Sequence, residues 1–119
     1  MGLVSTRRPP DKSPLVQERL DAIYEKVRRS FEENLTTIDD ATRRLASGEL
    51  DDAGRKAAEG AAHRLVGAAA MVGFPDATRP ARRLEEAFAA ADVGPTHVPR
   101  MRADTEELRA LLAGHPHDA

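Results

Sequence analysis

Apolar residues recur every three or four positions along most of the chain, which is the spacing of one face of an α-helix. The first such stripe follows Ser13 and Pro14, an N-cap residue and a proline that suits a first turn, and Gly48 suits its end. Ser30 begins the four-residue pattern of a capping box. The stripe therefore predicts either one helix over residues 14–47 or two helices that meet near Ser30. Its apolar members are Val16, Leu20, Ile23, Val27, Phe31, Leu35, Ile38 and Leu45.

Three further helices are predicted from the same spacing and from their turn residues. They run from Asp51 or Asp52 to about Val72, from Asp76 or Thr78 through Phe88, and from about His97 to Ala113. Pro80 fits the middle helix only in its first turn, because a proline inside a helix removes a hydrogen bond and clashes with the preceding turn. Short links between these helices predict an all-α fold, an antiparallel four-helix bundle with an additional or extended N-terminal helix.

A chain of 119 residues has the length of one ordinary domain. We predict that this domain covers residues 13–114, between a flexible lead-in of residues 1–12 and a flexible tail of residues 115–119. Apolar residues make up 40% of the sequence, but only one Tyr, three Phe and no Trp are present, so the core must consist mainly of Leu, Val, Ile and Ala. Such compositions are typical of closely packed helices.

Several classes of function are disfavoured by what the sequence lacks. No cysteine is present, which excludes disulfides and thiolate sites. The net charge is −2 and no basic patch is interleaved with aromatic residues, so we expect no nucleic-acid partner. Neither a signal peptide nor a membrane-spanning segment is visible, so we expect no membrane association and a cytoplasmic location. His115 and His117 have no third ligand beside them, so we expect no metal site.

His63 stands apart on a helical wheel of the segment from Gly54 to Phe74. At about 100° per residue, Leu65 and Val72 fall on the side opposite to His63. Six alanines fall near that side and complete the predicted buried face: Ala57, Ala58, Ala61, Ala62, Ala68 and Ala69. We therefore predict that the imidazole of His63 points to solvent.

Two glycines flank His63 at helical spacing, Gly60 before it and Gly67 after it. A glycine inside a helix costs about 1 kcal/mol relative to alanine, whereas a longer side chain at either position would lean over the imidazole. Clear space around one exposed histidine suggests that another molecule approaches it. An exposed histidine is nevertheless more often an ordinary surface residue, and interior glycines often serve close helix packing. Spacing alone does not identify the chemistry.

The residues from His63 to Glu85 (HRLVGAAAMVGFPDATRPARRLE) resemble the signature of the histidine-containing phosphotransfer (Hpt) family. That signature is His-x-Leu-Lys-Gly, a second glycine six residues after the first, a pair of small or apolar residues in the next helix, and Leu-Glu. The matching positions, without a gap, are His63, Leu65, Gly67, Gly73, Ala77, Ala81, Leu84 and Glu85. The family's four-helix bundle agrees with the helical layout predicted above.

The resemblance implies that His63 accepts a phosphoryl group from an aspartate on a receiver domain and passes it to another receiver. A neutral imidazole nitrogen is nucleophilic near pH 7, and such a transfer requires positioning and charge neutralisation more than covalent machinery. In the family the magnesium ion belongs to the receiver partner, so this chain needs no cofactor and is a phosphocarrier rather than an enzyme. The expected partners are response-regulator receiver domains, a hybrid histidine kinase, or both, and we expect a monomer rather than a dimer.

One position departs from the signature, because Val66 stands where the family has lysine. A cation at that position would help to hold the phosphoryl oxygens. Lys56 lies seven residues before His63 on the same face and is the best placed substitute. The other cations nearby are Arg64, a neighbour of the phosphoryl site, and Arg82 and Arg83 on the next helix. Each of them is most simply explained as a solvated surface charge.

The surface around His63 predicts a face on which a partner docks. Its members are Glu59, Val66, Ala70 and Phe74, although Phe74 is better explained as a plug over the end of the core. The leading hypothesis is a histidine phosphocarrier of a two-component phosphorelay. The first alternative, which Val66 favours, is a phosphorylation-incompetent bundle that binds and regulates a receiver domain or histidine kinase. The second is a purely structural helical adaptor.

Overall fold

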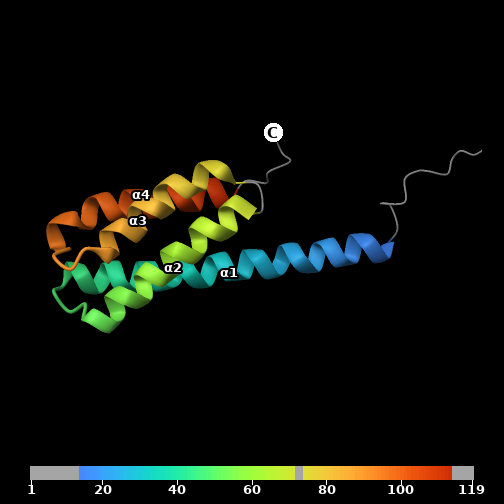
Figure 1. The fold of residues 1–119 in the computed structure, drawn as a ribbon. Helices are drawn as coiled ribbons and strands as arrows, with labels where there is room; N and C mark the ends of the chain where they lie inside the picture. Colours follow the sequence, from blue (N-terminus) through green and yellow to red (C-terminus); the bar gives the residue numbers. More distant parts are fainter. Residues whose placement is uncertain (1–13, 72–73, 114–119) are drawn as a thin grey trace, which may run out of the picture. The chain divides into compact units, whose positions relative to one another are not determined.

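The computed structural model describes residues 14–71 and 74–113, and this part of the chain contains four α-helices (Figure 1). They are α1 (Pro14–Ala46), α2 (Asp52–Met71), α3 (Thr78–Ala89) and α4 (Val98–Ala113). Two short 3-10 helices, η3 (Pro75–Ala77) and η4 (Pro95–His97), precede α3 and α4. No strand occurs in the described ranges, and the predicted all-α class is confirmed. The predictions for Ser13, for Val72 and Gly73, for the lead-in and for the tail with His115 and His117 lie outside the described residues.

Helix α1 is one uninterrupted helix of 33 residues, so the predicted extension of the N-terminal helix is confirmed. The capping-box pattern at Ser30 does not start a new helix. Capping requires backbone N–H groups that have no partner, and inside a helix these groups are already bonded to the preceding turn. The four-residue pattern at Ser30 therefore does not interrupt a helix that a continuous apolar stripe stabilises.

The chain divides into two compact units, Met1–Ser30 and Phe31–Ala119. In the first unit, the described residues form the N-terminal part of α1. Its large apolar side chains are exposed: Leu15, Val16, Leu20, Ile23 and Tyr24. Polar residues on the same segment pair along the helix, as Arg28 does with Glu25 at 2.8 Å.

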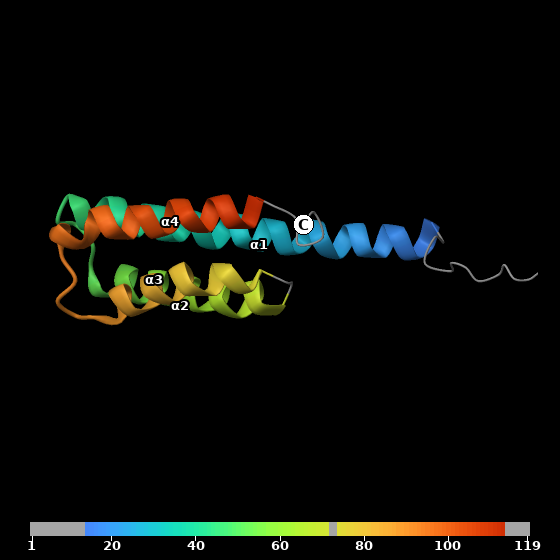
Figure 2. The same cartoon turned by 90° about the horizontal axis from the view of Figure 1, so that it is seen from above.

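The second unit is a helical bundle built from residues 31–46 of α1 together with α2, α3 and α4. Figure 2 shows α3 beside α2, and α4 beside this part of α1, where Arg109 of α4 donates a hydrogen bond to Asp39 of α1 at 2.7 Å. That hydrogen bond also raises the pKa of the Arg109 guanidinium. The largest fully buried side chains are Leu35, Ile38, Leu65, Pro80, Leu84, Phe88, Met101 and Leu108. Each buried leucine or phenylalanine stabilises the bundle by about 1.5–3 kcal/mol relative to an exposed one.

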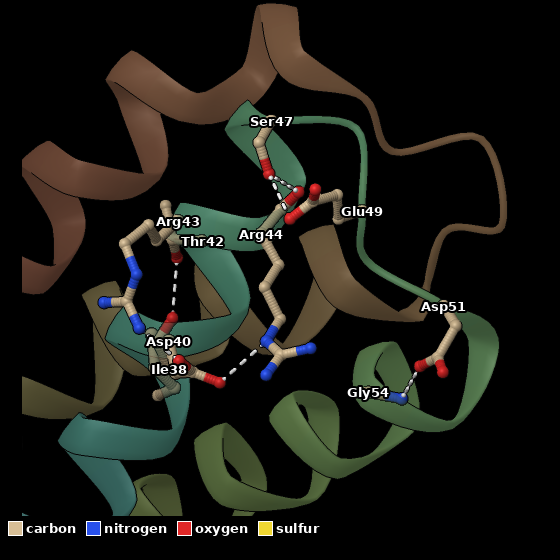
Figure 3. Close-up of polar contacts among 9 residues, drawn as sticks. All are labelled: Ile38, Asp40, Thr42, Arg43, Arg44, Ser47, Glu49, Asp51 and Gly54. Carbon is tan, nitrogen blue, oxygen red and sulfur yellow. Dashed lines mark hydrogen bonds and ion pairs between the residues drawn. The ribbon is translucent and has the colours of Figure 1, made fainter.

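The corner between α1 and α2 shows why the two helices end and begin where the sequence predicts (Figure 3). Gly48 has a φ of 76°, a backbone conformation that glycine adopts without strain. The N–H of Glu49 then donates to the carbonyl of Arg44 at 2.8 Å, which closes the end of α1. At the start of α2, the Asp51 carboxylate accepts the N–H of Gly54 at 2.7 Å and so caps the helix.

The predicted buried face of α2 is wrong at two positions. Ala57 was expected on the buried face of α2 but is exposed, and Ala68 is only half-buried. Both lie at the margin of that face, and Ala57 lines an open groove between α1 and the first turns of α2. The last helix begins at Val98, in agreement with the predicted start at about His97, and a 3-10 turn from Pro95 precedes it. Pro80 lies in the first turn of α3, as predicted, and is buried.

Candidate functional site

His63 lies on the solvent-facing side of α2, with its side chain 71% exposed. Its direction is set by the opposite side of the helix, where Ala58, Ala62 and Leu65 are fully buried in the bundle core. The helix cannot rotate about its axis without bringing these apolar groups into water. The predicted exposure of the imidazole is therefore observed, and it is held in place by the packing of the same helix.

One ring nitrogen of His63 is bound by Glu85 of α3, with Nδ1 and Oε2 separated by 2.8 Å. The Glu85 side chain is 26% exposed, and the buried Leu84 and Phe88 fix its place on α3. An ionised carboxylate only accepts hydrogen bonds, so we assign the hydrogen of the neutral imidazole to Nδ1. Nε2 then carries the free lone pair, on the part of the ring that Glu85 does not hold.

Sequence reasoning did not give Glu85 a role at the site. It matched the last position of the family signature, which was a signal that it belongs near the histidine. The two residues are 22 positions apart and on different helices, however, and a helical wheel of α2 contains no information about α3.

The two glycines beside His63 differ in what surrounds them. A Cβ added at Gly67 would meet no atom within 4 Å, so this glycine is not required by close packing of helices. A Cβ at Gly60 would lie 3.5 Å from Nη1 of Arg64, an ordinary contact. The space above His63 is therefore open on the side of Gly67 and bounded by a flexible side chain on the side of Gly60.

The predicted docking residues near His63 differ in their exposure. Among the predicted docking residues, Glu59 and Val66 are half-buried and Ala70 is exposed. Met71 was not predicted to take part, yet this residue is 81% exposed at the end of α2. Phe74 is half-buried, and its ring packs edge to face on Phe31 of α1 with centroids 6.3 Å apart. This contact supports the interpretation of Phe74 as a plug over the core.

The predicted cations do not converge on His63. Arg64 donates from Nε to the Oδ1 atom of Asn34 on α1 at 3.1 Å, so its guanidinium is directed along the α1 side of α2. The pKa of Asp52 is lowered by its hydrogen bond with Arg55 and by the charge of Arg55, and to a smaller extent by the charge of Lys56, which is exposed. Neither cation has a contact with the imidazole among the described residues.

No group of three or more potential metal ligands occurs in residues 14–71 and 74–113. The other histidine in this part of the chain, His97, is exposed, and its Nδ1 accepts the N–H of Gly94 at 3.0 Å. In the same ranges, no helix is both long enough and apolar enough to cross a membrane.

Comparison with known proteins gives one finding. The family model of the Hpt domain matches residues 17–114, which covers most of the chain and contains the whole of the site described above. The chain matches no curated protein and no solved structure.

Proposed function

The chain belongs to the Hpt domain family, whose members are phosphotransfer modules of phosphorelays, and on this premise we propose that His63 is its phosphoryl acceptor. The observation that carries the proposal is the hydrogen bond from His63 Nδ1 to Glu85 at 2.8 Å on an otherwise cleared helix face. It leaves Nε2 as the nucleophilic nitrogen and limits the rotation of the ring. A surface that only adheres to a partner needs neither feature.

The reaction at His63 is a transfer of one phosphoryl group from a receiver aspartate. The Nε2 lone pair forms a bond to phosphorus while the bond from phosphorus to the aspartyl oxygen breaks, and its electron pair returns to the aspartate carboxylate. The Nδ1 hydrogen stays on the ring, which becomes a phosphorylated imidazolium. Glu85 accepts a hydrogen bond from this ring throughout and offsets the positive charge that develops on it. The reverse sequence passes the group to the next receiver.

Domains of this family interact with receiver domains and histidine kinases. We expect the magnesium ion of the reaction to be bound by the receiver, so this chain has to present the imidazole in the correct orientation and to allow close approach. A partner has room on this side of α2, because the space beside Gly67 is open and the side chain of Ala70 is small. Met71 is exposed at the end of the same helix and is available for contact. The protein is then a phosphocarrier, and Nε2 of His63 is the atom of this chain that forms a bond in the reaction.

A second candidate function is supported by Val66. Without the family's lysine, the bundle would bind a receiver domain or a histidine kinase and regulate it by occupancy, with no transfer. This alternative gives no reason for the Glu85 contact or for an open space at Gly67, and we therefore rank it second.

Phosphoryl transfer from a panel of phosphorylated receiver domains tests the proposal directly. The wild-type protein is compared with the His63→Gln variant, and His97→Gln serves as a matched control at another exposed histidine. We expect label that is stable in alkali and lost in acid on wild type and on His97→Gln, and none on His63→Gln. Label on all three proteins would show that His63 is not the acceptor. Binding of a receiver without label on any of the three would favour the regulatory alternative.

A further inference from the structure

The phosphoryl group proposed for His63 would lack a positive partner on α2. Side chains of a helix lean toward its N-terminus, so the position three residues after His63 is the one that covers it. Val66 occupies that position and carries no charge. Glu85 adds a negative charge at the other side of the ring. A phosphoryl group with two negative charges therefore requires a cation from elsewhere.

Two of the cations in the surroundings are already bound to other groups. Arg64 is hydrogen-bonded to Asn34, and Arg83 is bound to Asp104 and Glu107 on α4, at 2.9 Å and 3.0 Å. Lys56 lies about 10 Å from His63 along the helix axis, at 1.5 Å per residue.

Arg82 is not bound in this way. It lies on α3, one turn before Glu85, and three-residue neighbours on a helix share a face. It is exposed, and no hydrogen bond or ion pair to it occurs within the described residues. Ala81 and Leu84 on the same helix are fully buried, so Arg82 is directed away from the core.

The register of α2 and α3 brings Arg82 toward the site. Arg55 of α2 contacts the carbonyl of Phe88, whereas His63, further along α2, contacts Glu85, which precedes Phe88 on α3. The two helices are therefore antiparallel, and the turn before Glu85 lies beside the turn that follows His63. That turn contains Val66, so Arg82 lies on the turn of α3 next to the position where the family has lysine.

We propose that Arg82 supplies the positive charge to the phosphoryl group on His63, from the neighbouring helix instead of from position 66. This inference rests on the proposed function. As Nε2 bonds to phosphorus and the aspartyl oxygen leaves, the guanidinium donates hydrogen bonds to the phosphoryl oxygens, and no proton or electron pair is exchanged with it. A guanidinium suits this role because its fixed array of donors can hold two oxygens at once.

The test measures the rate of transfer from a phosphorylated receiver to wild type and to Arg82→Ala. Arg79→Ala is the matched control, because Arg79 lies one turn earlier on α3, is exposed and has no ion pair among the described residues. At saturating receiver we expect Arg82→Ala to be about tenfold slower, which corresponds to about 1.4 kcal/mol of transition-state stabilisation, and Arg79→Ala to be within about twofold of wild type. Arg82→Lys should retain most of the rate, since the charge remains.

A second variant distinguishes charge supply from other effects. Adding Val66→Lys to Arg82→Ala places the cation at the family's position, and we expect it to restore the transfer rate and the half-life of the isolated phosphohistidine. Equal rates for wild type, Arg82→Ala and Arg79→Ala would overturn the inference. It would also be overturned if Arg82→Ala raised only the receiver concentration at half-saturation, because Arg82 would then be a docking residue. Label on His63→Gln, or none on wild type, would instead refute the proposed function.

Discussion

The contact between Arg83 and Asp104 links α3 to α4, and the contact between His63 and Glu85 links α2 to α3. Each of them connects a carboxylate to a basic side chain on a neighbouring helix. In the first pair the carboxylate is almost buried, with 8% of the Asp104 side chain exposed, and the guanidinium is always charged. In the second pair the imidazole is 71% exposed and is charged only when protonated. The distances are nearly the same, at 2.9 Å and 2.8 Å.

The comparison shows that geometry alone does not distinguish a structural contact from a reactive one. Arg83 cannot give up its charge, has a second acid at Glu107, and stabilises the boundary between two helices. Within residues 14–71 and 74–113, His63 has one hydrogen-bond partner and keeps a second ring nitrogen free, and Gly67, one turn later, leaves open space. The first pair is expected to matter for folding and the second for transfer. Substitutions at Arg83, Glu85 and Gly67 test these expectations.

The largest effect is expected from Arg83→Met, which keeps much of the aliphatic length and removes the charge. Asp104 would then be an almost buried carboxylate without its partner, and we expect the free energy of unfolding to fall by about 2 kcal/mol, or about 30-fold in the equilibrium constant. Chemical denaturation measures this loss. Transfer by the folded fraction should be unchanged, and a variant that unfolds like wild type would show that the pair contributes nothing to stability.

The sequence predicted the elements of the bundle well where the determining contacts are local. Gly48 ends α1, Asp51 caps α2 and Pro80 lies in the first turn of α3, and each outcome depends on hydrogen bonds or clashes within one turn. The exposure of His63 was also predictable, because it depends only on the apolar side of its own helix.

The sequence did not predict contacts between helices, because they depend on register and on side-chain direction. The partner of His63 is Glu85 on another helix, and Arg64 binds Asn34 on α1 rather than lying free beside the site. The prediction that Ala57 is buried was wrong for a related reason. The width of a buried face depends on how closely the neighbouring helices approach, and a helical wheel contains no information about those neighbours.

The second effect in size is expected from Glu85→Ala. It removes the acceptor of Nδ1, so the ring is no longer oriented and its developing charge is no longer offset. We expect transfer to slow about tenfold, with Glu85→Gln falling between this variant and wild type because an amide oxygen still accepts the hydrogen bond. Stability should change by less than about 0.5 kcal/mol, since the contact is exposed. Rapid-quench transfer assays and denaturation curves measure both quantities, and a large loss of stability with normal transfer would reverse the roles assigned to the two pairs.

The smallest effect is expected from Gly67→Ala, and it tests the open space beside His63. The added Cβ meets no atom within 4 Å, so the helix should gain up to about 1 kcal/mol of stability, about fivefold in the unfolding constant. Gly54→Ala is the matched control inside the same helix, where a Cβ would lie 2.9 Å from Leu50 Cδ1 and 3.1 Å from the capping Asp51 Oδ1, so these side chains must shift and the gain in stability should be smaller. If a receiver must approach His63 over Gly67, the more stable Gly67→Ala variant should transfer more slowly at low receiver concentration, and Gly67→Leu more slowly still. Unchanged transfer in Gly67→Leu would show that the partner does not use this space, and the glycine would then have no explanation in the chemistry of His63.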